Sequence, residues 1–371
     1  MSARLHPLFR AMTGMEPLDF RESPIVDSHL DLAENVTLFG RDMTLPAAQL
    51  RAIERRTRQQ ATATLPELVR GGVAVVIATV TPGFQVADVG EGFQPCSALY
   101  RTPEEAEAQA IKQIDLYHVW ETKELVRLIK SRADLKDHLA LWRDDRIPGL
   151  VLLMESADPI VCVDDLPKWW QRGLRLIGLT YGDTRYSAGV AGGNVSSKSG
   201  GLTPEGYKLL DRMAELGFSW DISHLTEEGV WQGFDMGFPR VCASHANART
   251  LTPTPRHLSD EVIRALAARG GVVGLVLYNA YLEPRWRHDR SILVTLDVHL
   301  RRQAEYISGL VGWGAVGIGS DLDGGFGQQE CPQEIDTEAD LFRIAAVLPP
   351  EARQAVLGTN WLNFLQRSLP D

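Results

Sequence analysis

The chain has 371 residues, of which 44% are hydrophobic, and its 38 basic and 48 acidic side chains give a formal net charge of −10. This acidic balance argues against a nucleic-acid or anionic-membrane partner, because both kinds of binding depend on clustered Lys and Arg. At about 150 residues per domain the length allows two or three domains, but an α/β barrel uses about 250 residues as one unit and tolerates insertions. A single elaborated barrel therefore stays open.

Targeting and redox signals are weak in this sequence. No apolar stretch approaches the roughly 18 residues of a membrane span, and the first residues lack the apolar region of a signal peptide. The four cysteines, at positions 96, 162, 242 and 331, form no C-x-x-C pair. We therefore expect a cytoplasmic enzyme without a disulfide framework, in which His and carboxylate side chains hold any metal.

Short apolar runs rich in β-branched residues alternate with longer helical patterns along the chain. The runs that predict strands are residues 25–32, 72–80, 150–155, 174–181, 219–224, 241–245, 271–277 and 315–321. Strands that alternate with helices are typical of parallel sheets. The pattern predicts an α/β fold, a (β/α)8 barrel of the TIM type, as one domain over residues 1–371 with about 20 peripheral N-terminal residues.

One long insertion, residues 81–149, separates the second and third predicted strands. We expect it to hold a loop over 81–102 and then a long helix over 103–130. Helices are also predicted over 204–216, which begins with a proline, and over 260–268, which Ser259 can cap. The glycine-rich segment 189–201 is expected to be flexible and to lie over the barrel mouth.

Six of the predicted strands end in polar side chains that suit metal binding or catalysis. In a barrel the carboxyl ends of the strands meet at one face, so these side chains are expected to share a pocket. The strand ends carry His29 with Asp31, then Glu155, Tyr181, His224, His245 and Asp321.

Each of these side chains alone has an ordinary explanation, such as a surface carboxylate at Glu155 or a helix N-cap at Asp321. Together they exceed the three protein ligands of a usual catalytic zinc and suit two divalent ions about 3.5–4 Å apart. His29 and Asp31 face the same side of a strand and can grip one ion. Glu155 is the natural bridge to the second, and such a site favours hydrolysis.

The chain resembles the membrane (renal) dipeptidase family of binuclear zinc peptidases, which belong to the amidohydrolase-type barrels. The resemblance rests on IVDSHLDL, LLMES, the block from GLTPEGYKLL to WDISH, CASHANART, RHLSDEVIRALAARGGVVGLV, VGIGSDLDG and LGTNWLNFL. These motifs run from residue 25 to about 366, which is nearly the whole chain. No single motif is as specific as the set.

The resemblance implies a role for each matching residue. His29 and Asp31 would bind the first zinc ion, and His224 and His245 would bind the second. Glu155 would bridge the two ions. The remaining roles fall to Asp321 as the proton carrier, Arg256 as the partner of the substrate carboxylate, and Tyr278 as a pocket wall.

One position departs from the family pattern. Where the family carries a His after the fourth strand, this chain has Tyr181, which can still donate a hydrogen bond to an oxyanion. The neighbouring Arg185 and Tyr186 are alternatives for that task, and Asp183 is a candidate reader of a substrate amine. The change puts the substrate class in doubt more than the metal site.

We therefore expect a metal-dependent hydrolase that cleaves dipeptides, or similar small carboxylate-bearing amides, with a hydroxide that bridges two zinc ions. The alternatives are a binuclear hydrolase of N-acyl amino acids, lactones or modified peptides, and a catalytically silent metal-binding homologue. The expected partner is the small substrate, with no nucleic acid or membrane, and the assembly, if any, is a homodimer.

Other motifs carry less weight. The G-x-G-x-x-G match at 312–317 precedes a strand, so it lacks the helix N-terminus that would hold a pyrophosphate, and no G-x-S-x-G elbow is present. The remaining histidines that we assign to the surface are His118, His138, His288 and His299.

Overall fold

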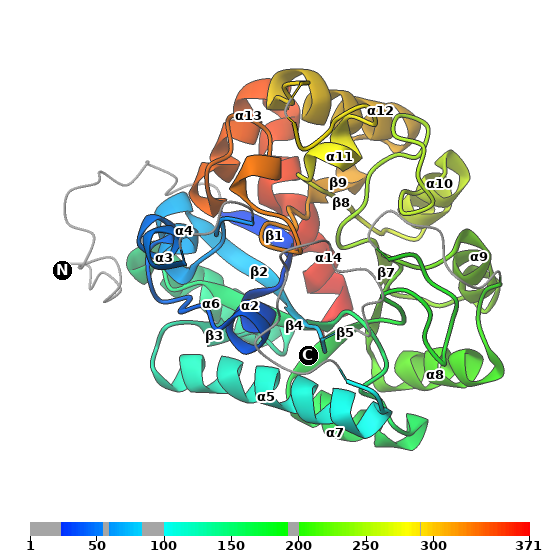
Figure 1. The fold of residues 1–371 in the computed structure, drawn as a ribbon. Coiled ribbons are helices and arrows are strands. Elements are labelled where there is room, and N and C mark those ends of the chain that lie inside the picture. Colours follow the sequence, from blue (N-terminus) through cyan, green and yellow to red (C-terminus); the bar gives the residue numbers. More distant parts are fainter. Residues whose placement is uncertain (1–23, 55–58, 84–99, 192–199, 290) are drawn as a thin grey trace.

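A parallel sheet, closed into a ring, organises the chain (Figure 1). The computed structural model describes residues 24–54, 59–83, 100–191, 200–289 and 291–371. Its nine strands follow the order β7-β6-β5-β4-β2-β1-β9-β8, with β3 paired to β4 off this path. An isolated parallel bridge between Ala243 and Val273 brings β7 beside β8 and closes the ring. The predicted (β/α)8 barrel is thereby confirmed.

The strands are short, and all lie where the sequence predicts them except β3. Their bounds are β1 Ile25–Leu30, β2 Val73–Val80, β3 Arg127–Leu128, β4 Gly149–Met154, β5 Leu174–Gly178, β6 Ser219–Asp221, β7 Val241–Cys242, β8 Val273–Leu275 and β9 Val316–Ile318. All residues of β2 and β4 are buried, without polar alternation, as expected for strands covered on both faces.

Helices surround the ring and cover its outer face. They are α2 Leu32–Phe39, α3 Ala47–Glu54, α4 Leu65–Gly71, α5 Pro103–Thr122, α6 Arg132–Asp145, α7 Leu166–Gln171, α8 Pro204–Leu216, α9 Glu227–Asp235, α10 Asp260–Ala268, α11 Asn279–Leu282, α12 Arg301–Val311, α13 Ile344–Val347 and α14 Asn360–Ser368. Two predicted helices have the predicted bounds: Thr203 caps α8 by accepting a hydrogen bond from the Gly206 amide, and Ser259 caps α10 in the same way.

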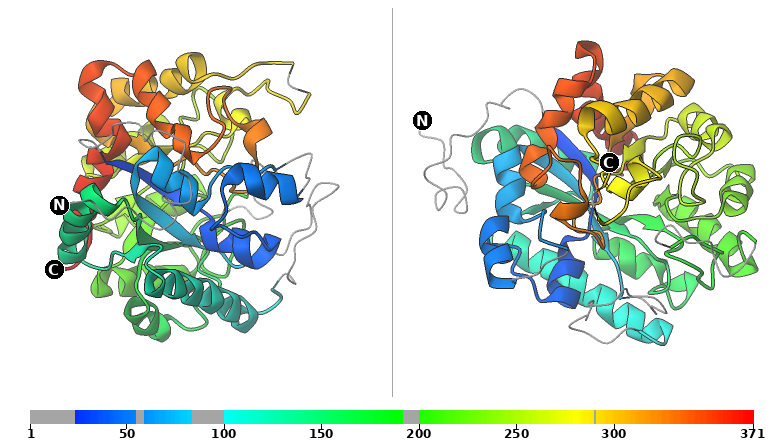
Figure 2. Two further views of the ribbon diagram at one scale, coloured as in Figure 1. Left: turned by 90° about the vertical axis from the view of Figure 1, so that its left-hand side faces the viewer. Right: turned by 45° about the horizontal axis from the view of Figure 1, so that its top comes forward.

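The barrel interior forms its own apolar cluster. Alternate residues of the strands, such as Val75 and Ile77 of β2, point inward and pack with Trp361 and Phe364 of α14. In the side view of Figure 2, α14 (red) lies at one end of the strands and α2 (blue) at the other. The end nearest α14 is therefore filled by apolar packing, which leaves the carboxyl ends of the strands for polar groups.

The insertion differs from its prediction. The predicted helix over 103–130 ends at Thr122, and the chain turns at Glu124, whose φ is 57°. Val126 and Ile129 are each 1% exposed on either side of β3, so apolar burial beside β4 is stronger than the helical pattern. Ser131 then caps the separate helix α6. Most of the predicted loop 81–102, most of segment 189–201 and the peripheral N-terminal residues lie outside the described residues.

One histidine assignment was wrong. His138 is only 2% exposed, and its Nε2 lies 2.8 Å from the carbonyl oxygen of Ala74. The imidazole of His138 lies so close to the backbone of residue 149 that only glycine fits there, because a Cβ would lie 2.7 Å from His138 Nε2. His118 and His288 keep much of their side chains exposed, whereas the His299 side chain is 13% exposed.

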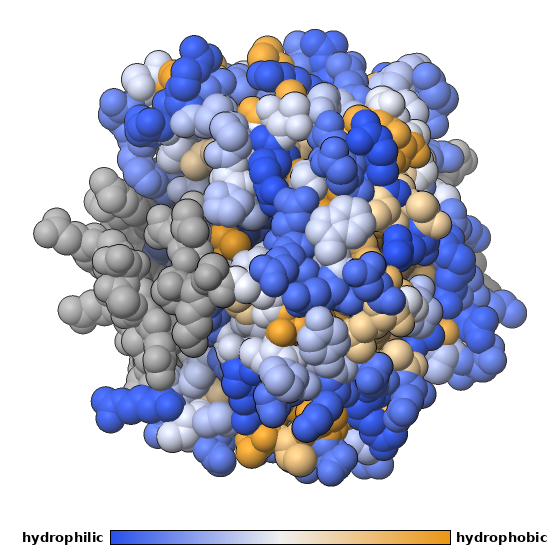
Figure 3. Space-filling model, turned by 90° about the vertical axis from the view of Figure 1, so that its right-hand side faces the viewer, coloured by the Kyte–Doolittle hydropathy of each residue, from blue (hydrophilic) through white to orange (hydrophobic). Residues whose placement is uncertain are grey.

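Within the described residues every helix is too short or too polar to cross a bilayer. On the face shown in Figure 3, hydrophilic residues predominate and hydrophobic residues are scattered. The homodimer stays a prediction.

Burial lowers the pKa of His138 to about 4 from its usual 6.5. The unfolded chain takes up a proton near pH 6.5 and the folded chain only near pH 4, so stability falls as the pH falls through this window. The loss is about 3 kcal/mol at full effect. We expect the stability difference between the wild type and His138→Gln to shrink between pH 7 and pH 4, measured by urea unfolding. The exposed His118→Gln is the control, and a pH-independent difference would contradict this account.

Candidate metal centre

Three imidazoles converge on one carboxylate oxygen at the carboxyl ends of the strands. The Oε1 atom of Glu155, which follows β4, lies 3.4 Å from Nε2 of His29, 3.2 Å from Nε2 of His224 and 3.7 Å from Nε2 of His245. All four residues are at most 5% exposed. The rings of His29 and His245 stack with centroids 3.6 Å apart. The sequence prediction that these strand ends meet is confirmed by the geometry.

A single hydroxyl orients two of the imidazoles. Ser244 Oγ lies 2.5 Å from Asp221 Oδ2, 3.0 Å from His29 Nδ1 and 2.9 Å from His245 Nδ1. A serine hydroxyl has one proton, and the acceptor-only carboxylate of Asp221 takes it. Ser244 therefore accepts from Nδ1–H of both rings. This fixes the tautomer in which each Nε2 can serve as a ligand.

His224 is oriented by the backbone. Its Nδ1 donates to the carbonyl oxygen of Val190 at 2.8 Å, which again leaves Nε2 for a ligand. Two such nitrogens, those of His224 and His245, lie 2.9 Å apart. The φ of His224 is 65°, a left-handed conformation that non-glycine residues adopt at a cost. The backbone strain at this position directs the imidazole into the cluster.

Asp31 is held by two threonines of the neighbouring strand end. Its Oδ1 accepts from the hydroxyl of Thr79 and, at 3.1 Å, from that of Thr81. Thr81 Oγ1 also lies 3.0 Å from Glu155 Oε2, so it links the two carboxylates. Burial and the charge of Glu155 raise the pKa of Asp31 to about 6.

The remaining carboxylate of the cluster is Asp321, after β9. Its Oδ1 lies 4.0 Å from His29 Nε2, and its φ is 61°, so a second predicted site residue occupies left-handed backbone. Burial raises its pKa well above the usual value, the nearby His29 charge lowers it, and the charges of Asp31 and Glu155 raise it further. A carboxyl group in this environment is suited to carry a proton.

Arg256 reaches the cluster from the segment after β7. Its Nη2 lies 3.0 Å from His224 Nε2 and donates to the carbonyl oxygen of His245 at 3.0 Å. Its Nε and Nη1 atoms are fully enclosed and have no hydrogen-bond partner in the described part of the chain. Buried donors without acceptors are costly, and a planar guanidinium suits a carboxylate.

The tyrosines divide into two groups. Tyr181, which follows β5, has its ring 4.6 Å from that of His224, and burial raises its pKa well above the usual value, as does the charge of Glu155. Tyr278 stacks on Phe326 at 4.8 Å, and its role as a pocket wall stays a prediction. The sequence analysis did not single out Tyr281, which lies near the site. Burial raises its pKa to about 12, the charge of Arg256 lowers this pKa and the charge of Asp321 raises it.

The sequence also missed Asp221, Ser244, Thr79 and Thr81. Their hydroxyl and carboxylate groups orient the predicted ligands, and nothing distinguishes a serine or threonine near a strand end until the neighbouring strand is known. The available signal is the polar residue inside each apolar run: Asp221 in SWDISH and the two threonines in ATVT.

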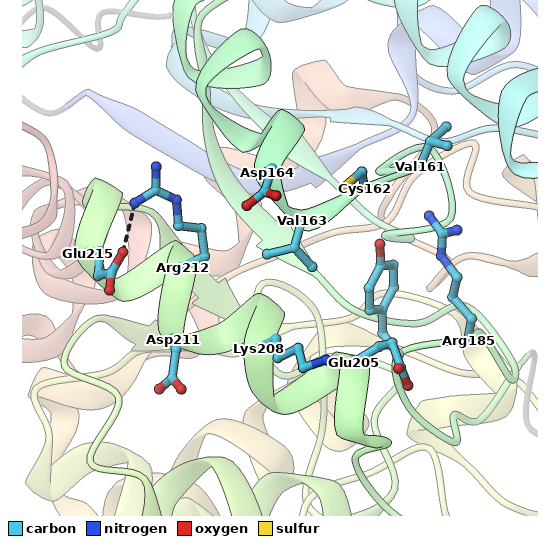
Figure 4. A pocket seen from close by; sticks show the side chains of 11 residues that line it. Val161, Cys162, Val163, Asp164, Arg185, Glu205, Lys208, Asp211, Arg212 and Glu215 are labelled. Carbon is cyan, nitrogen blue, oxygen red and sulfur yellow. Dashed lines mark hydrogen bonds and ion pairs between the residues drawn. The ribbon is translucent and has the colours of Figure 1, made fainter.

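The two residues that the sequence offers as alternatives to Tyr181 for binding an oxyanion lie outside the metal cluster. Arg185 and Tyr186 line an outer pocket between the segment before α7 and α8, together with charged residues of both signs such as Glu205 and Lys208 (Figure 4). No predicted metal ligand lines that pocket. Asp183 Oδ1 accepts from the Gly189 amide at 3.1 Å and so serves the loop backbone.

The cluster fits divalent metal ions. Two groups of three side chains have possible ligand atoms within 4.8 Å of one another, namely His29, Glu155 and His245, and His29, Asp31 and Asp321. These groups overlap at His29. The enclosed Nε2 of His29 has no hydrogen-bond partner among the described residues. An imidazole aimed at carboxylates without a hydrogen bond is what a metal ligand requires.

The charges of the cluster also favour the binding of a cation. Burial alone would lower the pKa of His29, but Glu155, Asp31 and Asp321 raise it to about 10. Burial alone would raise the pKa of Glu155, yet His224 and His29 hold it below its usual range. The carboxylates around His29 therefore favour positive charge at this point, which a divalent ion would supply.

Comparison with known proteins assigns the family. A model of the membrane dipeptidase family, peptidase family M19, matches residues 19–366. The chain belongs to this family. It is 30% identical to an uncharacterized protein of Klebsiella pneumoniae from the region 5′ of pqqA. The 250 aligned residues cover 65% of this chain and 88% of that protein. It is 27% identical to an uncharacterized dipeptidase of Schizosaccharomyces pombe. The 233 aligned residues cover 61% of this chain and 53% of that protein.

Solved structures share the fold. A dipeptidase of family M19 has a TM-score of 0.76 and 22% identity, and the match covers 94% of this chain and 99% of that one. A metallopeptidase of Rhodobacter sphaeroides, solved with a phosphinate mimic of the dipeptide L-Ala-D-Ala, has a TM-score of 0.74 and 22% identity, with 93% of this chain and 99% of that one covered. Because the chain belongs to the membrane dipeptidase family, it is a dipeptidase-type metallohydrolase.

Ser244→Ala is expected to weaken the binding of a divalent ion, with zinc as the probe, by about 10- to 100-fold, because Nδ1 of both His29 and His245 loses its acceptor while the candidate ligands themselves stay. Competition with a chromophoric chelator measures the affinity. Ser308→Ala on α12, whose hydroxyl donates to Glu305 within the same helix, is the matched control. Unchanged zinc affinity in Ser244→Ala would show that the hydroxyl does not orient the ligands.

Proposed function

We propose that the protein hydrolyses the amide bond of dipeptides at a centre of two zinc ions bridged by Glu155. The observation that carries this proposal is the convergence of three Nε2 atoms on Glu155 Oε1, each with its Nδ1 held by a hydrogen-bond acceptor. His29 and Asp31 would hold one ion, and His224 and His245 the other.

Two divalent ions held by these residues would supply Lewis acidity toward a water molecule and a carbonyl oxygen. The chain supplies the other parts of the reaction. Arg256, whose guanidinium lies beside His224, binds the carboxylate of the substrate. Tyr181 donates a hydrogen bond to the carbonyl oxygen as negative charge develops on it.

Asp321 moves the proton. Its carboxylate lies beside His29 at the edge of the cluster, and the left-handed backbone at this residue aims it inward. It accepts a proton from the attacking water and returns it to the nitrogen of the leaving amino acid. The products are two free amino acids.

A second candidate function is the hydrolysis of an N-acyl amino acid or a lactone by the same residues. The observation that favours it is Tyr181, a phenol beside His224, where the family pattern has an imidazole. A catalytically silent homologue is the third alternative, and the inward-facing Asp321 and Arg256 argue against it.

The test is a substrate panel with zinc-loaded protein: L-alanyl-D-alanine, N-acetyl-D-alanine and a lactone. We expect the dipeptide alone to be cleaved efficiently, with activity lost on chelation and restored by zinc. Asp321→Asn should lower kcat by about 100- to 10,000-fold and leave the metal content unchanged. The exposed Asp211→Asn on α8 is the control. Efficient cleavage of the N-acetyl compound or the lactone in place of the dipeptide would favour the second candidate, and no cleavage at all the third.

A further inference from the structure

Glu34 is a buried carboxylate that neither the family pattern nor the proposed reaction uses. It lies in the first turn of α2, three residues after Asp31, and is 5% exposed. Within the described residues its carboxylate makes no hydrogen bond and no ion pair. A buried carboxylate without a partner costs several kcal/mol, so its presence calls for a ligand outside the chain.

The environment of Glu34 points to a positive ligand. Burial raises its pKa well above the usual value, and so do the charges of Asp31, Glu155 and Asp321. Glu34 therefore lies close enough to these carboxylates for their charges to act on it, and no basic side chain among the described residues balances it. Its oxygens are not among the fully enclosed unpartnered atoms, so a ligand can reach them.

Glu34 stands outside both groups of possible metal ligands. The groups of side chains whose ligand atoms lie within 4.8 Å of one another include Asp31, Asp321 and Glu155 but not Glu34. Glu34 thus remains available to a cation other than the metal ions. An ammonium group is the cation that a hydrolase of dipeptides meets in its substrate.

The position of Glu34 in the barrel agrees with this assignment. Glu34 follows β1, whereas Arg256 follows β7 and reaches His224 after β6. In the ring order β1 stands opposite β6 and three places from β7, so the segments that carry Glu34 and Arg256 begin on different sides of the ring. Tyr181 lies on the side of His224, and the charge of Glu34 acts on it across the site.

We propose that Glu34 binds the free α-ammonium group of the substrate and so selects dipeptides over N-acylated or des-amino compounds. This inference rests on the proposed function, because it names the part of the dipeptide opposite the carboxylate that Arg256 holds. Asp183, the amine reader that the sequence suggested, is engaged by the Gly189 amide, whereas Glu34 is free.

The experiment compares L-alanyl-D-alanine with propionyl-D-alanine, which has the same shape without the amine. Glu34→Gln should lower kcat/KM for the dipeptide by about 10- to 100-fold, mainly through KM, and leave that for the des-amino compound unchanged, because only the charged hydrogen bond is lost. Glu34→Asp should keep part of the preference. The exposed Asp42→Asn, just beyond α2, is the control and should behave as the wild type.

Two further measurements separate binding from folding and metal loss. Calorimetry of a phosphinate dipeptide mimic, with and without its amine, should show the preference for the amine in the wild type and its loss in Glu34→Gln. The zinc content and the urea midpoint of Glu34→Gln should equal those of the wild type or, for the midpoint, exceed it, since an unpartnered buried acid has been removed.

Equal effects of Glu34→Gln on both compounds, or loss of zinc from the variant, would overturn the assignment of the ammonium site. A wild type that cleaves neither compound would contradict the proposed function instead. In that case the calorimetric comparison still decides on Glu34, because it does not depend on turnover.

Discussion

The hydrogen bond from the Ser244 hydroxyl to Asp221 is the interaction on which the centre depends. Because the single hydroxyl proton goes to Asp221 at 2.5 Å, the oxygen must accept from the rings of both His29 and His245. Three strands, β1, β6 and β7, are thereby joined through one oxygen atom, and two Nε2 atoms are turned toward Glu155. A carboxylate, a hydroxyl and two imidazoles thus determine the chemistry that the barrel mouth can support.

The backbone around this oxygen is built to allow the contact. Gly274 and Gly319 stand beside the Ser244 carbonyl, and a Cβ at either would lie 1.9 Å from its oxygen. Ser28 donates to the same carbonyl at 2.5 Å. At His224 and Asp321 the chain accepts left-handed φ values of 65° and 61°. The closely packed backbone below the cluster and the strained residues at its rim together aim the side chains inward.

Much of the fold, and the set of side chains that meet at the strand ends, could be predicted because both follow from residue type at strand ends. His224 and His245 each close an apolar run, and parallel strands bring such ends together. The orienting groups could not be predicted, because a serine such as Ser244 gains its role from a neighbouring strand. His138 and the end of α5 were assigned wrongly since tertiary burial outweighed local polarity and helical spacing. Glu34 was overlooked for a similar reason: its lack of a partner is visible only in three dimensions.

The central claim is that one carboxylate joins two metal ions. The most direct measurement is the number of divalent ions bound per chain after zinc loading and removal of excess metal, in the wild type and in Glu155→Gln. Because Glu155 Oε1 lies within 3.7 Å of all three imidazole Nε2 atoms, its loss should affect both ions. The account predicts two ions per chain in the wild type and fewer than two in the variant. A wild type that binds at most one ion, or a variant that still binds two, would contradict it.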